Sequence, residues 1–131
     1  MTPAALLVKP AVWRNRRRRA VVEQMCANGA VVVESHTIDD IAAEVAALPS
    51  STMLVACGGD GTVHLAVNAV AGTGRPLAIV PLGTGNDVAR HFGLRPTPAN
   101  DVWNAPTTQV DLGHIQCADG TKRYFAGVAS C

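Results

Sequence analysis

The sequence predicts an α/β fold: an open, mostly parallel sheet with helices on both faces, ending in a β-hairpin. Apolar runs of strand length alternate four times with segments of helical character before the pattern of the chain changes. Such alternation is typical of parallel sheets, because each helix carries the chain back to the start of the next strand. In the last third, Val110–Cys117 and Arg123–Val128 resemble strands joined at Asp119–Gly120, a dipeptide that favours a hairpin turn.

Composition limits the class of protein. The 131 residues suffice for one domain, and 48% hydrophobic against 16% charged residues is typical of a compact globular chain. A net charge of +1 gives no reason to expect a nucleic-acid partner. Four scattered cysteines and no expected leader before the first strand indicate a cytoplasmic protein. The apolar runs are too short to span a membrane, so any membrane contact is expected to be peripheral, at the inner face.

The first elements follow from their composition. Ala4–Val8 is uniformly apolar, as expected for a strand buried on both faces, and Lys9–Pro10 ends it. We expect a helix over Val12–Ala27, stopped by Asn28–Gly29. Ala30–Glu34 is the expected second strand.

The next helix has the clearest signals. Thr37 is placed to cap it, with Asp39 and Asp40 in the first turn, where negative charge is favourable. Its apolar residues recur at the helical period: Ile38, Ile41, Val45 and Leu48.

Two glycine-rich turns organise the centre of the chain. The strand that begins at Met53 runs into Gly58-Gly-Asp-Gly-Thr62, and Thr62 is expected to open a helix over Val63–Ala71. A second strand, Leu77–Val80, leads into Gly83-Thr-Gly-Asn-Asp87. Glycines permit positive φ and close approach to a ligand, and backbone N–H groups at a helix start can bind phosphate. Because both turns follow the carboxyl ends of strands, we expect one shared phosphate site there.

Other interpretations of the turns are open. Gly58, Gly59 and Gly61 could serve only a tight turn. Neither turn matches the P-loop or the full dinucleotide fingerprint, which disfavours nicotinamide or flavin redox chemistry.

The amino-acid sequences of the two turns resemble those of a known family. Gly58-Gly-Asp-Gly-Thr62 followed by Pro81-Leu-Gly-Thr-Gly-Asn-Asp87 is similar to the diacylglycerol kinase catalytic domain, a group that includes bacterial lipid kinases, sphingosine kinases and ceramide kinase. The first motif also occurs in 6-phosphofructokinases and NAD kinases, whereas the pair is specific. The resemblance runs from about Leu6 to the last residue. It implies the phosphofructokinase/NAD kinase-like N-terminal fold and the ATP-binding domain of a lipid kinase, which transfers the γ-phosphate of ATP to a lipid hydroxyl such as that of diacylglycerol.

The resemblance also implies a nucleotide site with Mg²⁺. The residues that it assigns to ATP are Thr37, Gly58, Gly59, Asp60, Gly61, Thr62, Gly83, Thr84 and Gly85. Asp60 is assigned to the metal, which would relieve its repulsion from polyphosphate. Asn86 and Asp87 are assigned to the junction with the acceptor. Each polar residue has a plainer alternative: Asp60 could cap a helix, Thr37 is explained fully as a cap, and Asn86–Asp87 could be a helix start.

The strongest charge cluster consists of five arginines, called here the basic segment: Arg14, Arg16, Arg17, Arg18 and Arg19. These residues oppose the helix dipole and one another. A solvated helix face, contact with nucleotide phosphates and contact with an anionic membrane are equally open interpretations.

The sequence departs from the family in three places. Lys9–Pro10 stands where Asn-Pro is usual, and His64–Leu65 stands where a polar residue and Glu are usual. A second, β-rich domain that supplies the general base in relatives is expected to be absent, so no catalytic base is assigned. An apolar edge and self-association are expected of such a truncated chain. The alternatives are a soluble kinase for NAD or a sugar phosphate, and a nucleotide-binding fragment without catalysis.

Overall fold

The computed structural model describes residues 3–83, 112–116, 118–120 and 122–125. The elements in chain order are β1 (Ala4–Val8), α1 (Pro10–Trp13), α2 (Arg16–Ala27), β2 (Val31–Val32), α3 (Ile38–Ala46), β3 (Met53–Gly58), α4 (Asp60–Val70), β4 (Leu77–Pro81), β5 (Gly113–Gln116) and β6 (Lys122–Phe125). The predicted helix near 88–92 lies outside the described residues.

The predicted α/β architecture is confirmed. Strands β1 to β4 form a parallel sheet in the order β2-β1-β3-β4, in which Leu6 pairs with Val55. Strands β5 and β6 form the expected antiparallel hairpin, with Gln116 paired to Lys122. Gly120, in the loop between them, has a φ of 88°, which a glycine adopts without strain.

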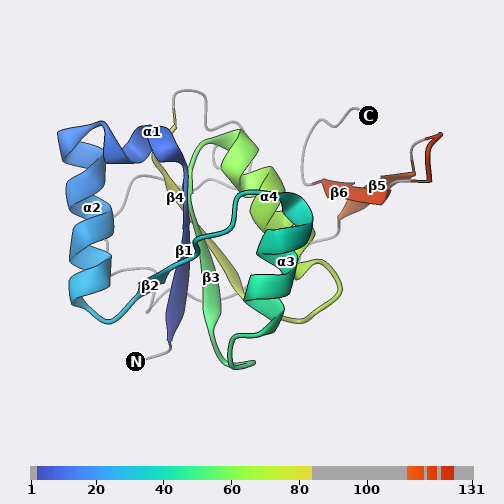
Figure 1. The fold of residues 1–131 in the computed structure, drawn as a ribbon, viewed down its shortest axis with the longest axis horizontal. Coiled ribbons are helices and arrows are strands. Elements are labelled where there is room, and N and C mark those ends of the chain that lie inside the picture. The colour runs from blue at the N-terminus through green and yellow to red at the C-terminus, as the bar shows by residue number, and fades with distance from the viewer. Residues whose placement is uncertain (1–2, 84–111, 117, 121, 126–131) are drawn as a thin grey trace.

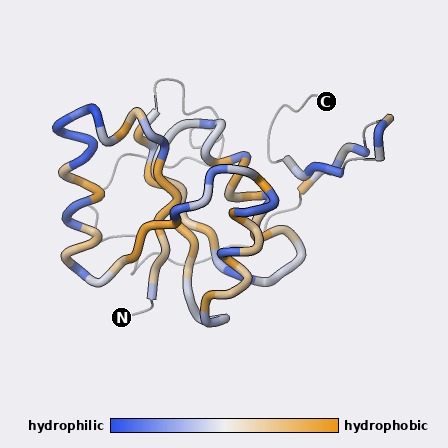
Figure 2. Tube along the Cα trace, in the orientation of Figure 1, coloured by the Kyte–Doolittle hydropathy of each residue, from blue (hydrophilic) through white to orange (hydrophobic). Residues whose placement is uncertain are grey.

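The sheet separates two apolar cores, one on each face. Residues Ala4 and Leu6 of β1 face the core closed by α1 and α2, whereas Ala5 and Leu7 face the core closed by α3 and α4. Figure 1 shows the two helical layers on either side of the sheet. Figure 2 shows that hydrophobic residues run through the strands of the sheet. The uniformly apolar strands are therefore explained by burial on both faces.

Three element boundaries differ from the prediction. The single helix expected over Val12–Ala27 is two helices, because Asn15 takes an extended conformation and caps α2 by accepting a hydrogen bond from Arg18 N–H at 3.1 Å. Strand β2 is only two residues long and ends as Val33 donates to the carbonyl of Leu6. Helix α4 begins at Asp60 rather than after Thr62, and Gly59 is its N-cap.

Within the described residues, none of the helices combines the length and the apolar character needed to cross a bilayer.

Candidate functional site

The strand order creates a crevice at the carboxyl ends of β1 and β3. From β1 the chain passes through α1 and α2 to β2 on one side, and then through α3 to β3 on the other side of β1. The connections therefore diverge between β1 and β3. In open α/β sheets, this divergence point is where ligands bind.

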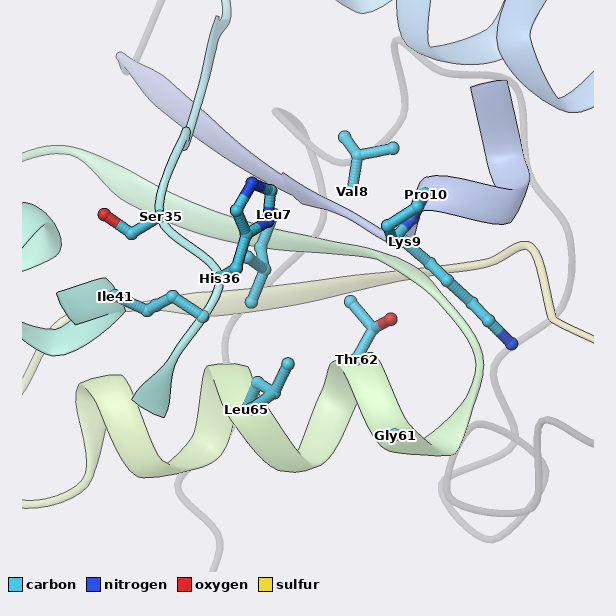
Figure 3. Close-up of a pocket in the computed structure, with 10 residues that line it drawn as sticks. All are labelled: Leu7, Val8, Lys9, Pro10, Ser35, His36, Ile41, Gly61, Thr62 and Leu65. Atoms are coloured by element: carbon cyan, nitrogen blue, oxygen red, sulfur yellow. The ribbon is translucent and has the colours of Figure 1, made fainter. Parts of the chain in front are cut away.

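A pocket of about 430 Å³ lies at this end of the sheet (Figure 3). Its walls come from the end of β1 and the start of α1, the segment after β2, the first turn of α3, and the first two turns of α4. The lining residues are Leu7, Val8, Lys9, Pro10, Ser35, His36, Ile41, Gly61, Thr62 and Leu65. Leu7, Ile41 and Leu65 give part of the wall an apolar character, whereas Lys9, Gly61 and Thr62 form a polar part.

The first glycine turn uses its glycines differently from the prediction. Gly59 has φ −99° and ψ −159°, and neither Gly58 nor Gly61 has a positive φ. Gly58 is required instead by close packing, because a Cβ there would lie 2.5 Å from Thr62 Oγ1 and 3.1 Å from Lys9 Cβ. A Cβ on Gly61 would meet no described atom within 4 Å. The expectation of positive φ was wrong, since the chain passes from strand to helix through ordinary backbone conformations.

The start of α4 borders the pocket through Gly61 and Thr62. The first helical hydrogen bond links Val63 N–H to the carbonyl of Gly59, so the N–H groups that precede Val63 in α4 make no bond to a carbonyl four residues earlier in the helix. These groups carry the positive end of the helix dipole. Thr62 is only 5% exposed and lines the pocket, whereas Asp60 lies in the first turn and is not the N-cap.

The second glycine turn starts beside the first. Pro81 pairs with Gly58, and Leu82 N–H donates to the Gly58 carbonyl at 2.9 Å, which places Gly83 at the same edge of the sheet. The expected neighbourhood of the two turns is thus present as far as the described chain extends. Thr84, Gly85, Asn86 and Asp87 lie outside the described residues.

Thr37 stands just beside the pocket. Its hydroxyl accepts a hydrogen bond from Asp40 N–H at 3.1 Å and so caps α3. The neighbouring His36 lines the pocket, whereas Thr37 does not. The capping role is therefore present, and a role in nucleotide binding stays a prediction.

Glu44 fixes the segment that follows β2, a role that the sequence analysis missed. Its carboxylate accepts hydrogen bonds from the backbone N–H groups of Glu34 at 3.0 Å and Ser35 at 3.2 Å, and from the Ser35 hydroxyl at 2.8 Å. The Ser35 hydroxyl bond, aided by the two backbone bonds, lowers the pKa of Glu44 despite partial burial. The pocket wall formed by Ser35 and His36 is thereby held against α3.

Comparison with known proteins identifies the family. The Diacylglycerol kinase catalytic domain family matches residues 12–117. The chain belongs to this family. A diacylglycerol kinase of Mycobacterium tuberculosis is 41% identical over 101 residues, which cover 74% of this chain and 32% of that relative. A diacylglycerol kinase of Bacillus subtilis is 35% identical over 97 residues, or 67% of this chain and 29% of the relative.

A second group of relatives carries a broader description. A probable lipid kinase of the YegS-like type from Pseudomonas fluorescens is 43% identical over 68 residues, which cover 49% of this chain and 23% of that protein. The chain thus spans about a third or less of the length of these diacylglycerol and lipid kinases.

The first glycine turn of this diacylglycerol kinase-type domain offers one carboxylate to a magnesium ion. Among the described residues, no group of three or more His, Cys, Asp or Glu side chains gathers in one place. Asp60 is the carboxylate of the first glycine turn. Mg²⁺ in kinases is bound by one or two carboxylates together with substrate phosphates and water, so one aspartate is an adequate protein contribution.

The basic segment lies on the surface and not in the pocket. Arg14, Arg16, Arg17 and Arg19 are exposed, and Arg19 pairs with Glu23 at 3.1 Å. The neighbouring Trp13 is 38% exposed. None of the five arginines is among the described residues that line the pocket. Figure 2 shows the strongly hydrophilic start of α2 that they create.

Cys57 lies in the core directly before the first glycine turn. Burial raises the pKa of its thiol to about 12, so the thiol stays protonated at neutral pH. It acts as an apolar packing residue and not as a nucleophile.

Proposed function

We propose that this domain binds Mg-ATP for a lipid kinase, which transfers the γ-phosphoryl group to the hydroxyl of a diacylglycerol-like lipid. The observation that carries the proposal is the pocket at the carboxyl ends of β1, β2 and β3, bordered by Gly61 and Thr62 of α4, in a chain of this family. The printed names of the relatives, diacylglycerol kinase and probable lipid kinase, favour a lipid over NAD or a sugar phosphate as acceptor.

The polyphosphate is expected at the polar part of the pocket. The amides of the first turn of α4 supply hydrogen-bond donors, and Gly61 leaves room for oxygen atoms to approach. The apolar surface formed by Leu7, Ile41 and Leu65 suits the flat face of a base.

Phosphoryl transfer needs positioning and charge neutralisation more than covalent chemistry. Asp60 would hold Mg²⁺ from the protein side, and the ion would neutralise negative charge on the phosphates. We assign Thr37, the glycines of both turns and Thr84 to ATP, and Asn86 and Asp87 to the junction with the acceptor. No general base is assigned to this chain.

The lipid acceptor also gives the basic segment a proposed role. Trp13 and the arginines on either side of Asn15 combine an exposed aromatic ring with positive charge, which suits an anionic membrane surface. Sedimentation with anionic vesicles tests this role. Replacement of Arg16 to Arg19 by serine should abolish co-sedimentation, and unchanged binding would exclude the role.

Titration calorimetry of Mg-ATP tests the nucleotide site. Gly61→Val should weaken binding at least tenfold, because the branched side chain occupies the path of the phosphates, whereas Gly61→Ala should have a smaller effect. Asp60→Asn should weaken Mg-ATP more than metal-free ATP. A folded wild-type chain that binds no nucleotide would refute the proposal.

The acceptor is tested separately with the gene product that contains this sequence. We expect radiolabelled γ-phosphate to appear in diacylglycerol presented in mixed micelles, and not in NAD or fructose 6-phosphate. The opposite pattern would establish the soluble-kinase alternative.

A further inference from the structure

Asn68 joins two parts of the molecule that lie far apart in the sequence. It is in α4, about two turns beyond Gly61 of the pocket, and its side chain binds the main chain of Tyr124 in β6. We propose that Asn68 is a positioning residue that couples docking of the β5–β6 hairpin on α4 to the binding of nucleotide in the pocket. This inference rests on the proposed function, because it concerns the same ligand.

The helix fixes the orientation of the Asn68 amide. Its Nδ2 donates to the carbonyl of His64, four residues earlier in α4, at 2.8 Å. Nδ2 also donates to the carbonyl of Tyr124 at 3.1 Å, and Oδ1 accepts from Tyr124 N–H at 2.9 Å. A side-chain amide has two N–H donors, so it can serve both carbonyls at once. The bond to His64 anchors the amide to its own helix, and the hairpin therefore binds a group that moves with α4.

Docking on α4 determines the position of the hairpin. Among the described residues, β5 and β6 form a sheet of two strands, and such a hairpin alone is only marginally stable in water. Tyr124 lies opposite His114 of β5, yet its own N–H and carbonyl both bond to Asn68. The amide thus takes the place of a neighbouring strand along β6. Leu112 and Tyr124 add apolar packing on the same side.

The pocket wall and the hairpin share one apolar core, the one that α3 and α4 close. Ile41 belongs to this core and Leu65 packs against it, and both residues also line the pocket. Tyr124 packs against the same core. Because close-packed interiors transmit displacements, a shift of α4 on ligand binding should also change the surface on which the hairpin docks. The pocket has its observed form with the hairpin docked, so docking should favour binding.

Titration calorimetry with Mg-ATP tests this coupling in the gene product that contains the sequence. Asn68→Ala removes the bonds to His64 and Tyr124 and should weaken Mg-ATP binding about five- to tenfold, a typical coupling between two sites. Asn68→Asp keeps an acceptor for Tyr124 N–H and should weaken binding less.

Arg75→Met is the control for a general loss of stability. Arg75 donates to the carbonyls of Pro49 and Thr52, before the amino end of β3, and is not among the described residues that line the pocket. Its replacement should destabilise the fold without removing a bond to the hairpin. Mg-ATP affinity should therefore be unchanged in Arg75→Met.

Hydrogen exchange at the Tyr124 amide gives the reverse readout. Saturating Mg-ATP should slow this exchange in the wild type by up to the factor by which Asn68→Ala weakens binding, because the two equilibria are linked. Amides of α2, on the other face of the sheet, should not slow by this factor. The measurement needs no variant, so it decides the question even if Asn68→Ala fails to fold.

The outcomes separate this inference from the proposed function. Equal Mg-ATP affinity in the wild type and Asn68→Ala would overturn the coupling and leave the nucleotide site standing. Exchange at Tyr124 that does not respond to Mg-ATP, or an equal loss of affinity in Arg75→Met, would do the same. A wild-type protein that binds no Mg-ATP would overturn both.

Discussion

Asn68 holds the main chain of Tyr124 through both ends of its side-chain amide. Its Nδ2 donates to the Tyr124 carbonyl at 3.1 Å, and its Oδ1 accepts from the Tyr124 N–H at 2.9 Å. The amide thus pairs with β6 as a strand residue would, and it fastens the hairpin to α4. Leu112 and Tyr124 add apolar packing against the same core.

Removal of this amide should release the hairpin. Asn68→Ala deletes both bonds to Tyr124 and should destabilise the docked hairpin by about 1–2 kcal/mol. Amide hydrogen exchange at Tyr124 should accelerate by about tenfold or more, while exchange in β3 stays unchanged. Asn68→Asp is the matched control, because it keeps the acceptor for Tyr124 N–H and should show a smaller effect. Equal protection of the Tyr124 amide from hydrogen exchange in the wild type, Asn68→Ala and Asn68→Asp would show that Asn68 does not hold the hairpin.

Gly58→Ala should destabilise the fold by about 1–3 kcal/mol, because the new methyl group would overlap Thr62 Oγ1 and Cβ. The cost arises from packing and not from backbone strain, so shortening the neighbour should relieve part of it. A double-mutant cycle with Thr62→Ala in urea should therefore give a favourable coupling energy. Gly61→Ala, with no described atom within 4 Å of its new Cβ, should be neutral or slightly stabilising in the helix. Independent effects at positions 58 and 62 would refute the packing explanation.

The hydrogen bonds of Glu44 should make the stability of the pocket wall depend on pH. Its pKa is lowered in the folded state, so its contribution to stability is complete above the pKa of glutamate in an unfolded chain, about 4.3. The contribution is lost as the pH falls through the lower folded pKa. Glu44→Gln should reduce the free energy of unfolding by about 1 kcal/mol at neutral pH and by less in acid. If the free energies of unfolding of the wild type and Glu44→Gln differed by the same amount at neutral pH and in acid, this role of Glu44 would be contradicted. Asp39→Asn, which changes an exposed carboxylate of the same helix, is the control.

Arg75 should stabilise the fold without serving the pocket. Its guanidinium donates to the carbonyls of Pro49 at 2.9 Å, Thr52 at 2.8 Å and Leu48 at 3.4 Å, where α3 leads into β3. Arg75→Met should lower the free energy of unfolding by about 2 kcal/mol. Arg75→Lys should recover only part of that loss, because an ammonium lacks the planar fork. Mg-ATP affinity should be unchanged, since these contacts lie at the amino end of β3; a weakened affinity would show that the two ends of the sheet are not independent.

The regular elements were accessible from the sequence because they depend on local pattern. Ala4–Val8 is the strand expected from its apolar run, and Thr37 caps α3 as its position indicated. The sequence analysis missed the break between α1 and α2 at Asn15. Asn15 caps α2 from an extended conformation, and that conformation is visible only in the folded chain.

The site was accessible in outline and not in its contacts. The glycine turns pointed to the end of the sheet where the pocket lies, yet the need for Gly58 depends on Thr62 and Lys9, whose approach only the folded chain defines. Ser35 and His36 could have been suspected because they follow a strand end. The bonds between Asn68 and Tyr124 join residues 56 positions apart, and no local signal predicts such a pair.

Helix α4 presents Gly61 to the pocket at one end and Asn68 to the hairpin further along. At a rise of about 1.5 Å per residue, the two positions are about 10 Å apart on one stiff rod. A ligand that tilts α4 should also move the hairpin, because Asn68 binds the main chain of Tyr124. By thermodynamic reciprocity, a partner that grips the hairpin in the tilted position raises the affinity for that ligand by the same factor. Helix α4 is thus the element that connects the pocket to the hairpin.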